Sequence, residues 1–220
     1  MKHVAVVDCA IKTLVTPCFN RLVTTFSEVR FTYHPVGFYG MDSLYELESL
    51  DGLMILGSAS NVDEPQYLWH GPLADYILSM LYNQIPTLGI CFGHQLVAAM
   101  FGAEVGYFSA ERTKLLGSRE SCVAGGHLLA VGEKLILPIS HCQVVKTLPE
   151  CMGVWLESVD HPFDGLFHKE FPYWGLQQHP ESSRHFLTHD IKNIPEAHIP
   201  FIQDHGEKVI RAFINKVMES

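Results

Sequence analysis

Short apolar runs rich in β-branched residues alternate with helix-like segments through the first half of the chain. Apolar runs without polar alternation are typical of strands that are buried on both faces, as in a parallel sheet. The segments between these runs place apolar residues at helical spacing. The expected strands are residues 3–8, 29–36, 52–57 and 86–91, and the expected helices are residues 17–28, 65–84 and 92–102.

The pattern changes at about residue 104, where helical periodicity gives way to short strand-like runs. We interpret these runs as an antiparallel extension of the same domain, so that residues 1–220 form a single α/β domain. The ligand site of such a fold is expected at the carboxyl ends of the parallel strands. The expected strands of this half are residues 127–131, 135–139, 153–158, 165–169 and 173–178, followed by an amphipathic helix at 206–218.

Composition and charge exclude several classes of protein. With 47% hydrophobic and 18% charged residues, the chain is too apolar to be disordered. A net charge of −9 argues against a surface that neutralises nucleic-acid phosphates. No run reaches the ~20 apolar residues of a membrane span, and Asp8 and Lys12 interrupt the apolar N-terminal stretch, unlike in a signal peptide. The 6 cysteines are irregularly spaced, which favours reduced thiols in a cytoplasmic protein.

Residues 86–102 place a cysteine between an apolar strand and a helix. Cys91 is flanked by Gly89 and Gly93, which is the cysteine form of the G-x-S-x-G nucleophile elbow. Because the nucleophile occupies a sharp, strained turn, the residues two before and two after it must be small. The start of the following helix favours a thiolate and places the N–H of Phe92 to bind an oxyanion. The alternative is a buried cysteine in a turn that the glycines merely permit.

A cysteine nucleophile needs a base, and His179 has a suitable neighbourhood. It is followed by Pro180, which favours an extended backbone at His179, and then by Glu181. Residues two apart in an extended chain point to the same side, so Glu181 can reach one imidazole nitrogen while the other faces Cys91. This arrangement would fix the tautomer and stabilise an imidazolium beside a thiolate. We therefore expect Cys91, His179 and Glu181 to form a catalytic triad.

Small residues follow the expected strand at 52–57. A loop of this kind brings backbone N–H groups close to the ligand site. Gly57 or Ser58 would then supply the second half of an oxyanion hole, together with Phe92. An ordinary turn between a strand and a helix is the alternative for this segment.

Together these blocks resemble the class I glutamine amidotransferases, the family with a Cys-His-Glu triad, over about residues 3–183. Residues 89–95 fit its G-I-C-x-G-H-Q elbow, residues 175–181 fit its G-x-Q-x-H-P-E block, and residues 141–149 look like its H-x-D-x-V-x-x-L-P segment. The likeness extends to stand-alone proteins related to the glutaminase domain of GMP synthase. With this resemblance we expect a flavodoxin-like three-layer α/β sandwich, with a mainly parallel central sheet and an antiparallel extension.

The resemblance also implies an activity. Cys91 would attack the side-chain amide of glutamine, and His179, oriented by Glu181, would act as base and then as acid for the departing ammonia. Ser58 and Phe92 would supply the oxyanion N–H groups. The products would be glutamate and ammonia, and any synthetase that uses the ammonia would be a separate chain.

Substrate binding is expected from two further residues. Gln95 matches the elbow glutamine, which in the family helps to hold the amino-acid end of glutamine, and His141 would line the pocket. Departures from the family pattern bear on the substrate: residues 57–59 read G-S-A in place of G-G-P, Gln143 replaces Asp, and Gln178 replaces an aromatic residue. They leave open a γ-glutamyl amide other than free glutamine. They also leave open a non-catalytic binding or regulatory protein that retains the pocket.

The remaining histidines and cysteines are weaker candidates for metal binding or catalysis. His185 and His189 are four apart in a histidine-rich segment, a spacing that binds metals on helices, but no third ligand follows at a convincing spacing. We therefore expect neither a metal nor a cofactor. The other five cysteines do not lie in an elbow, and we expect none of them to be a nucleophile.

Overall fold

The computed structural model describes residues 1–64, 66–191 and 194–220 of the chain. Its main sheet has nine strands, in the order β2-β1-β3-β4-β11-β10-β9-β6-β7. The first five run parallel: β2 (Arg30–His34), β1 (His3–Val7), β3 (Gly52–Ile55), β4 (Thr87–Ile90) and β11 (Tyr173–Leu176). The others are antiparallel to their neighbours: β10 (Gly165–His168), β9 (Met152–Glu157), β6 (Leu115–Val123) and β7 (Lys134–His141). A separate antiparallel pair comprises β5 (Val105–Tyr107) and β8 (Gln143–Val145).

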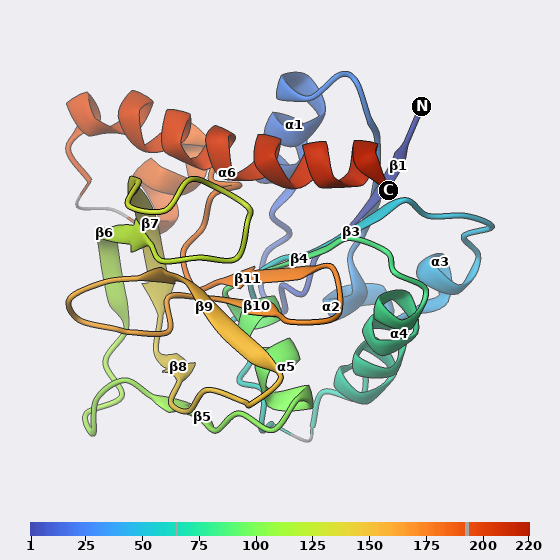
Figure 1. Ribbon diagram of the computed structural model, residues 1–220, viewed down its shortest axis with the longest axis horizontal. Coiled ribbons are helices and arrows are strands. Elements are labelled where there is room, and N and C mark those ends of the chain that lie inside the picture. The colour runs from blue at the N-terminus through green and yellow to red at the C-terminus, as the bar shows by residue number, and fades with distance from the viewer. Residues whose placement is uncertain (65, 192–193) are drawn as a thin grey trace.

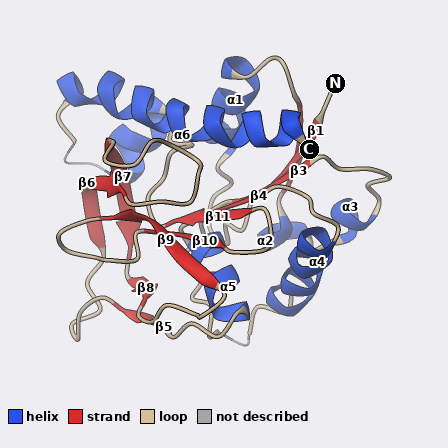
Figure 2. Cartoon of the chain, in the orientation of Figure 1, coloured by secondary structure: helices blue, strands red, loops and turns tan. Residues whose placement is uncertain are grey.

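Helices cover both faces of the parallel strands (Figure 1). Two of them, α1 (Thr16–Thr25) and α6 (Ile199–Glu219), lie on one face, and α4 (His70–Tyr82) and α5 (Phe92–Met100) lie on the other (Figure 2). The short helical elements are α2 (Val36–Tyr39), α3 (Asp42–Tyr45), a π-helix η1 (Phe186–Ile191) and a 3-10 turn η2 (Glu196–His198). This is the flavodoxin-like three-layer arrangement that the sequence predicts.

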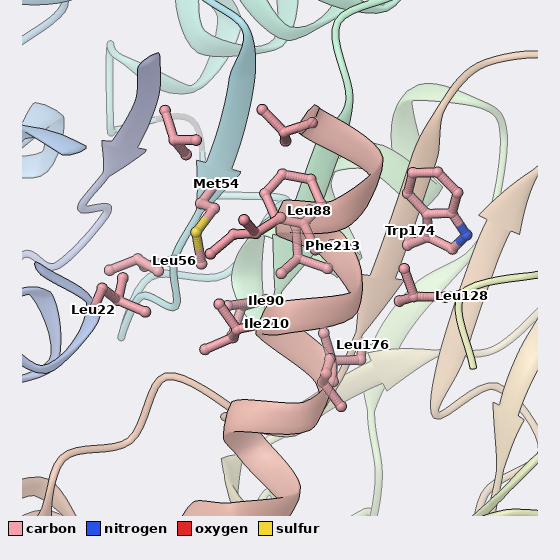
Figure 3. Close-up of a cluster of buried hydrophobic side chains, with 14 of the residues drawn as sticks. Leu22, Met54, Leu56, Leu88, Ile90, Leu128, Trp174, Leu176, Ile210 and Phe213 are labelled. Atoms are coloured by element: carbon pink, nitrogen blue, oxygen red, sulfur yellow. The ribbon is translucent and has the colours of Figure 1, made fainter. Parts of the chain in front are cut away.

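Each face of the sheet has its own apolar core. In the first, Ile210 and Phe213 of α6 pack over Leu88 and Ile90 of β4 (Figure 3). In the second, the apolar side of α4 and α5 packs on the opposite side of the same strands. Because apolar residues of β1 and β3 point alternately into the two cores, these strands read as continuous apolar runs.

The elements predicted for the first half of the chain are confirmed, with changes at their ends. The helix expected at 65–84 begins at His70, and Pro72 falls in its first turn, where a missing N–H is tolerated. Leu68, expected on the apolar face of that helix, is 86% exposed. Residue 65 lies outside the described residues. At the other end of the chain, the helix expected at 206–218 starts earlier, at Ile199.

Two predictions for the second half are wrong. Residues 127–131 form a loop rather than a strand, because left-handed backbone at Gly126, His127 and Gly132 interrupts any extended run. Residues 173–178 were expected in the antiparallel extension, but β11 pairs parallel to β4 and so belongs to the parallel part of the sheet. The sequence pattern also misses β6, whose buried positions include polar residues.

Candidate active site

Cys91 occupies the turn between β4 and α5 in a backbone conformation that non-glycine residues rarely adopt. Its φ is +51° and its ψ is −100°, and strain of this kind concentrates at functional sites. A Cβ on Gly93 would lie 2.5 Å from the carbonyl oxygen of Ile55, and a Cβ on Gly89 would lie 2.9 Å from the backbone of Gly93. Both glycines are therefore needed for the helix to start so close to the neighbouring strands.

His179 and Glu181 follow β11, next to β4 in the sheet. The N–H of Cys91 donates to the carbonyl of Leu176 at 2.8 Å, so Cys91 and His179 emerge from neighbouring strands at one edge of the sheet. Nδ1 of His179 lies 2.9 Å from Oε1 of Glu181. The side chains of Cys91, His179 and Glu181 are all buried.

The charges around His179 stabilise its protonated form. Burial opposes the charged imidazole, but the carboxylate of Glu181 and the sulfur of Cys91 outweigh burial and raise the pKa of His179 to about 10. Its Nε2 is buried and has no hydrogen-bond partner among the described residues. An imidazolium beside a cysteine sulfur, with one nitrogen free to transfer a proton, suits nucleophilic chemistry.

The loop after β3 also lies beside Cys91 and His179. A Cβ on Gly57 would lie 2.9 Å from Cε1 of His179 and 3.8 Å from Sγ of Cys91. The Ser58 hydroxyl accepts the N–H of Ser60 at 3.0 Å and so holds the loop. Neither Ser58 nor Ala59 has a positive φ, so the backbone here does not require the glycine that the family pattern places at 58.

A cavity of about 530 Å³ opens onto these residues. Its lining includes Gly57, Ser58, Cys91, His179 and Glu181, so the structure brings most of the predicted site together. The remaining walls come from residues 10–18, from Ala59, Lys114 and Ser140, and from three residues in and beside η1: His185, Phe186 and Asp190.

Sequence reasoning missed the wall at 10–18. Asp8 is fully buried at the end of β1, and its carboxylate accepts the N–H groups of Ala10 at 2.8 Å and Val15 at 3.0 Å. The hydroxyl of Tyr33 also donates to this carboxylate. One signal was available: a carboxylate at the carboxyl end of a buried parallel strand lies at the edge where ligands bind.

Both predicted substrate-binding residues lie outside the cavity lining. Gln95 is buried, and its Nε2 donates to the carbonyl of Gln143 at 2.7 Å and to Oε1 of Gln177 at 3.0 Å. His141 is also buried, and burial, with the charges of Arg119 and His179, lowers its pKa to about 3. Their roles in binding stay predictions.

Phe92 is the first residue of α5, so its N–H has no acceptor within the helix. Its ring is buried against His70, at 5.1 Å between centroids, and contributes packing rather than polar chemistry. The position of this N–H next to Cys91 is the one that an oxyanion hole needs, and its role there stays a prediction.

Behind the nucleophile lies a polar layer that sequence reasoning did not assign. Nε2 of Gln177 lies 3.5 Å from Sγ of Cys91. The next residue, Gln178, donates to the hydroxyl of Ser121 at 2.8 Å, and Ser121 donates to Asp164 at 2.9 Å. Asp164 pairs with Arg119 at 2.7 Å. The polar residue at 178, where the family has an aromatic, is thus matched by polar partners on β6.

The rings of His185 and His189 stack at 4.2 Å between centroids. Within residues 1–64, 66–191 and 194–220, no group of three or more His, Cys, Asp or Glu side chains is arranged to hold a metal ion. All six cysteines are free thiols. Across the same described ranges, no helix combines the length and the apolar character needed to cross a membrane.

Comparison with known proteins matches the sequence to one family and to several related proteins. The family described as glutamine amidotransferase class-I matches residues 6–192. The glutamine-hydrolysing GMP synthase subunit of Thermoplasma volcanium is 30% identical over 173 residues, which cover 78% of this chain and 81% of that protein. The corresponding subunit of Methanopyrus kandleri is 31% identical over 105 residues, covering 48% of this chain and 56% of the relative. The bifunctional protein TrpGD of Thermotoga maritima is 32% identical over 148 residues. The match covers 62% of this chain but only 24% of TrpGD.

Solved structures show the same fold. A glutamine amidotransferase from Thermotoga maritima superposes with a TM-score of 0.73 at 17% identity, covering 100% of this chain and 99% of that one. A glutamine amidotransferase from Methylobacillus flagellatus gives 0.70 at 16% identity, covering 97% and 94%. Identities this low support the fold alone, whereas the family match spans most of the sequence. The chain belongs to the class-I glutamine amidotransferase family.

Proposed function

We propose that this chain hydrolyses the side-chain amide of glutamine, or of a related γ-glutamyl compound, through a thioester on Cys91. One observation carries the proposal. A cysteine on a strained turn between strand and helix shares a cavity with a histidine that a carboxylate holds, in a chain of this family. Nucleophile, base and orienting group in this order are the parts that covalent amide hydrolysis needs.

The proposed reaction has two halves. The Cys91 thiolate attacks the amide carbon, and the N–H groups of Phe92 and Ser58 bind the oxyanion that forms. His179 then gives its Nε2 proton to the nitrogen, the C–N bond breaks, and the amine leaves. In the second half, His179 takes a proton from water, which attacks the thioester and releases glutamate. Glu181 holds Nδ1 of His179 throughout.

The test of the mechanism is the variant Cys91→Ser. Glutaminase activity should be lost, because a serine hydroxyl is a far weaker nucleophile than a thiolate in this site. Far-UV circular dichroism should be unchanged. Cys122→Ser, at a half-buried cysteine of β6, is the matched control and should retain activity. Full activity in Cys91→Ser would rule out the proposed nucleophile.

Labelling with a glutamine-like electrophile separates an enzyme from a binding protein. Cys18 lines the same cavity as Cys91, but burial and the nearby Glu181 carboxylate raise the pKa of Cys18 to about 12. We expect mass spectrometry to find the label on Cys91 and not on Cys18. No labelling at all would favour a non-catalytic binding or regulatory protein.

With glutamine as substrate, the leaving amine is ammonia, and we propose that a separate synthetase in the cytoplasm takes it up. The support is that several relatives are named as one subunit of GMP synthase, and that free thiols suit a reducing compartment. Glutaminase rates with and without cell extract and nucleotide substrates test this. A rate that never responds to extract would indicate a free-standing hydrolase.

A further inference from the structure

Two lysines lie at the mouth of the cavity, on different elements. Lys12 is on the loop between β1 and α1, which the Asp8 carboxylate fastens at both ends. Lys114 directly precedes β6. Both side chains are exposed, whereas Cys91 is 4% exposed, so the nucleophile lies at the floor and the lysines lie at the rim.

Lys114 precedes a strand that pairs with the segment beside Cys91. The carbonyl oxygen of Ser140 lies 4.0 Å from Sγ of Cys91, and Ser140 pairs across the sheet with Leu116. Lys114 is two residues before Leu116, which corresponds to about 7 Å along a strand. Lys114 and Cys91 line the same cavity.

Neither lysine forms an ion pair with another described residue. Among the described residues, neither Lys12 nor Lys114 has a carboxylate within ion-pair distance, while Lys2, Lys134, Lys208 and Lys216 each have one. The acidic residues of the lining are Glu181, which is held by His179, and Asp190. Among the exposed charged side chains of the described lining, Lys12 and Lys114 outnumber Asp190, so the rim of the cavity is net positive in a chain of net charge −9. Such a local field attracts anions.

The size of the cavity exceeds what one amino acid fills. Its volume of about 530 Å³ falls within the range of roughly 300–1,000 Å³ that encloses drug-sized ligands. Glutamine carries one carboxylate and loses only ammonia. A γ-glutamyl amino acid carries two carboxylates, one on each side of the amide that breaks.

Resting on the proposed function, we propose that the cavity takes γ-glutamyl amides whose amine part carries a carboxylate, namely γ-glutamyl amino acids or peptides, with Lys12 and Lys114 as counter-ions for that carboxylate. The chemistry balances as simple hydrolysis. The C–N bond breaks, water supplies the hydroxyl of the new glutamate carboxyl group, and the free amino acid leaves with the proton from His179.

The experiment compares γ-glutamylglycine with γ-glutamylglycinamide, which has nearly the same shape but lacks the second carboxylate. In the native protein we expect kcat/KM to favour γ-glutamylglycine by about tenfold, from two partly solvated ion pairs. In the double variant Lys12→Met/Lys114→Met the ratio should fall to about one. Lys146→Met, at an exposed lysine outside the cavity lining, should keep the ratio of the native protein.

The other outcomes overturn the proposal. If both substrates are hydrolysed equally by the native protein, the leaving-group carboxylate is not recognised, while the amide hydrolase function stands. If the double variant loses activity on both substrates and the ratio persists, the lysines bind the glutamyl carboxylate instead. If neither these amides nor glutamine is hydrolysed, the proposed function itself fails.

Discussion

Gly57 and His179 lie so close that a methyl group does not fit between them. A Cβ on Gly57 would lie 2.9 Å from Cε1 of His179, well inside van der Waals contact. The imidazole cannot turn freely to make room, because Nδ1 is held by Glu181. Gly57→Ala should therefore displace the ring relative to Cys91. A misplacement of about 1 Å costs up to about a hundredfold in kcat, which steady-state kinetics with glutamine would measure.

The matched control is Gly71→Ala in α4. Nothing lies within 4 Å of the Cβ that this change adds. It should leave kcat unchanged and stabilise the protein by up to about 1 kcal/mol, because alanine favours helix over glycine. If Gly57→Ala kept the native kcat, the contact with His179 would have no part in catalysis.

The raised pKa of His179 predicts a dependence of stability on pH. The ordinary value is 6.5, and the folded value is about 10. The folded state therefore binds this proton more tightly, so the stabilisation is complete below pH 6.5 and is lost as the pH rises to about 10. The difference in unfolding free energy between the native protein and His179→Gln should shrink over this interval. Urea unfolding at a series of pH values would measure it.

Glu181→Gln tests the cause of that dependence. It removes the charge that contributes most to raising the pKa of His179, which leaves Cys91 as the remaining charge that opposes burial. The pKa of His179 should therefore fall, and the pH interval should move downward. Cys91→Ala removes the second charge and should move the interval less. An interval that stays in place in Glu181→Gln would show that the carboxylate does not set the pKa.

The parts of the site that the sequence predicts are those whose signal is local. Cys91 with its two glycines, and His179 with Pro180 and Glu181, each lie within a few consecutive residues, and the geometry of one turn or one extended segment relates them. The carboxyl-end rule for parallel strands then brings the two segments to one edge. No long-range information is needed for that step.

The parts that the sequence does not predict depend on contacts between distant segments. The hydrophobic pattern does not predict β6, because Arg119 and Ser121 occupy buried positions in it. Their hydrogen-bonding partners, Asp164 and Gln178, are remote in sequence. Lys12 looks like an ordinary loop lysine until Asp8 fixes its loop beside the nucleophile. Similarly, the apolar run at 127–131 predicts a strand, but left-handed residues turn it into a loop.

Removing one partner of the buried ion pair between Arg119 and Asp164 should strongly lower the free energy of unfolding. Arg119→Met leaves the fully buried Asp164 carboxylate without its charge partner, for which we expect a loss of about 3–5 kcal/mol in unfolding free energy. The carbonyl of Asp164 also accepts the N–H of Gln177 at 2.7 Å, so the strand end before His179 should loosen and kcat should fall. Chemical denaturation and glutaminase kinetics measure the two effects.

A second ion pair on the neighbouring strands β6 and β7 provides the control. Lys134 and Glu120 are 69% and 54% exposed, so Lys134→Met should leave the denaturation midpoint nearly unchanged. The double variant Arg119→Met/Asp164→Leu should recover much of the loss, because no uncompensated charge remains buried. A double variant as unstable as Arg119→Met would assign the cost to packing rather than to charge.

His94 should weaken the fold in acid. It is fully buried in α5, neither ring nitrogen has a partner among the described residues, and burial, with nearby His161, lowers its pKa to about 3. The unfolded chain takes up a proton near pH 6.5 and the folded chain does not, so stability is lost as the pH falls from 6.5 towards 3. His94→Leu removes this loss and should shift the acid-unfolding midpoint, followed by tryptophan fluorescence, to lower pH. The exposed His198 gives the control His198→Gln, whose midpoint should match that of the native protein. A His94→Leu midpoint equal to the native one would mean that the acid sensitivity of the fold arises elsewhere.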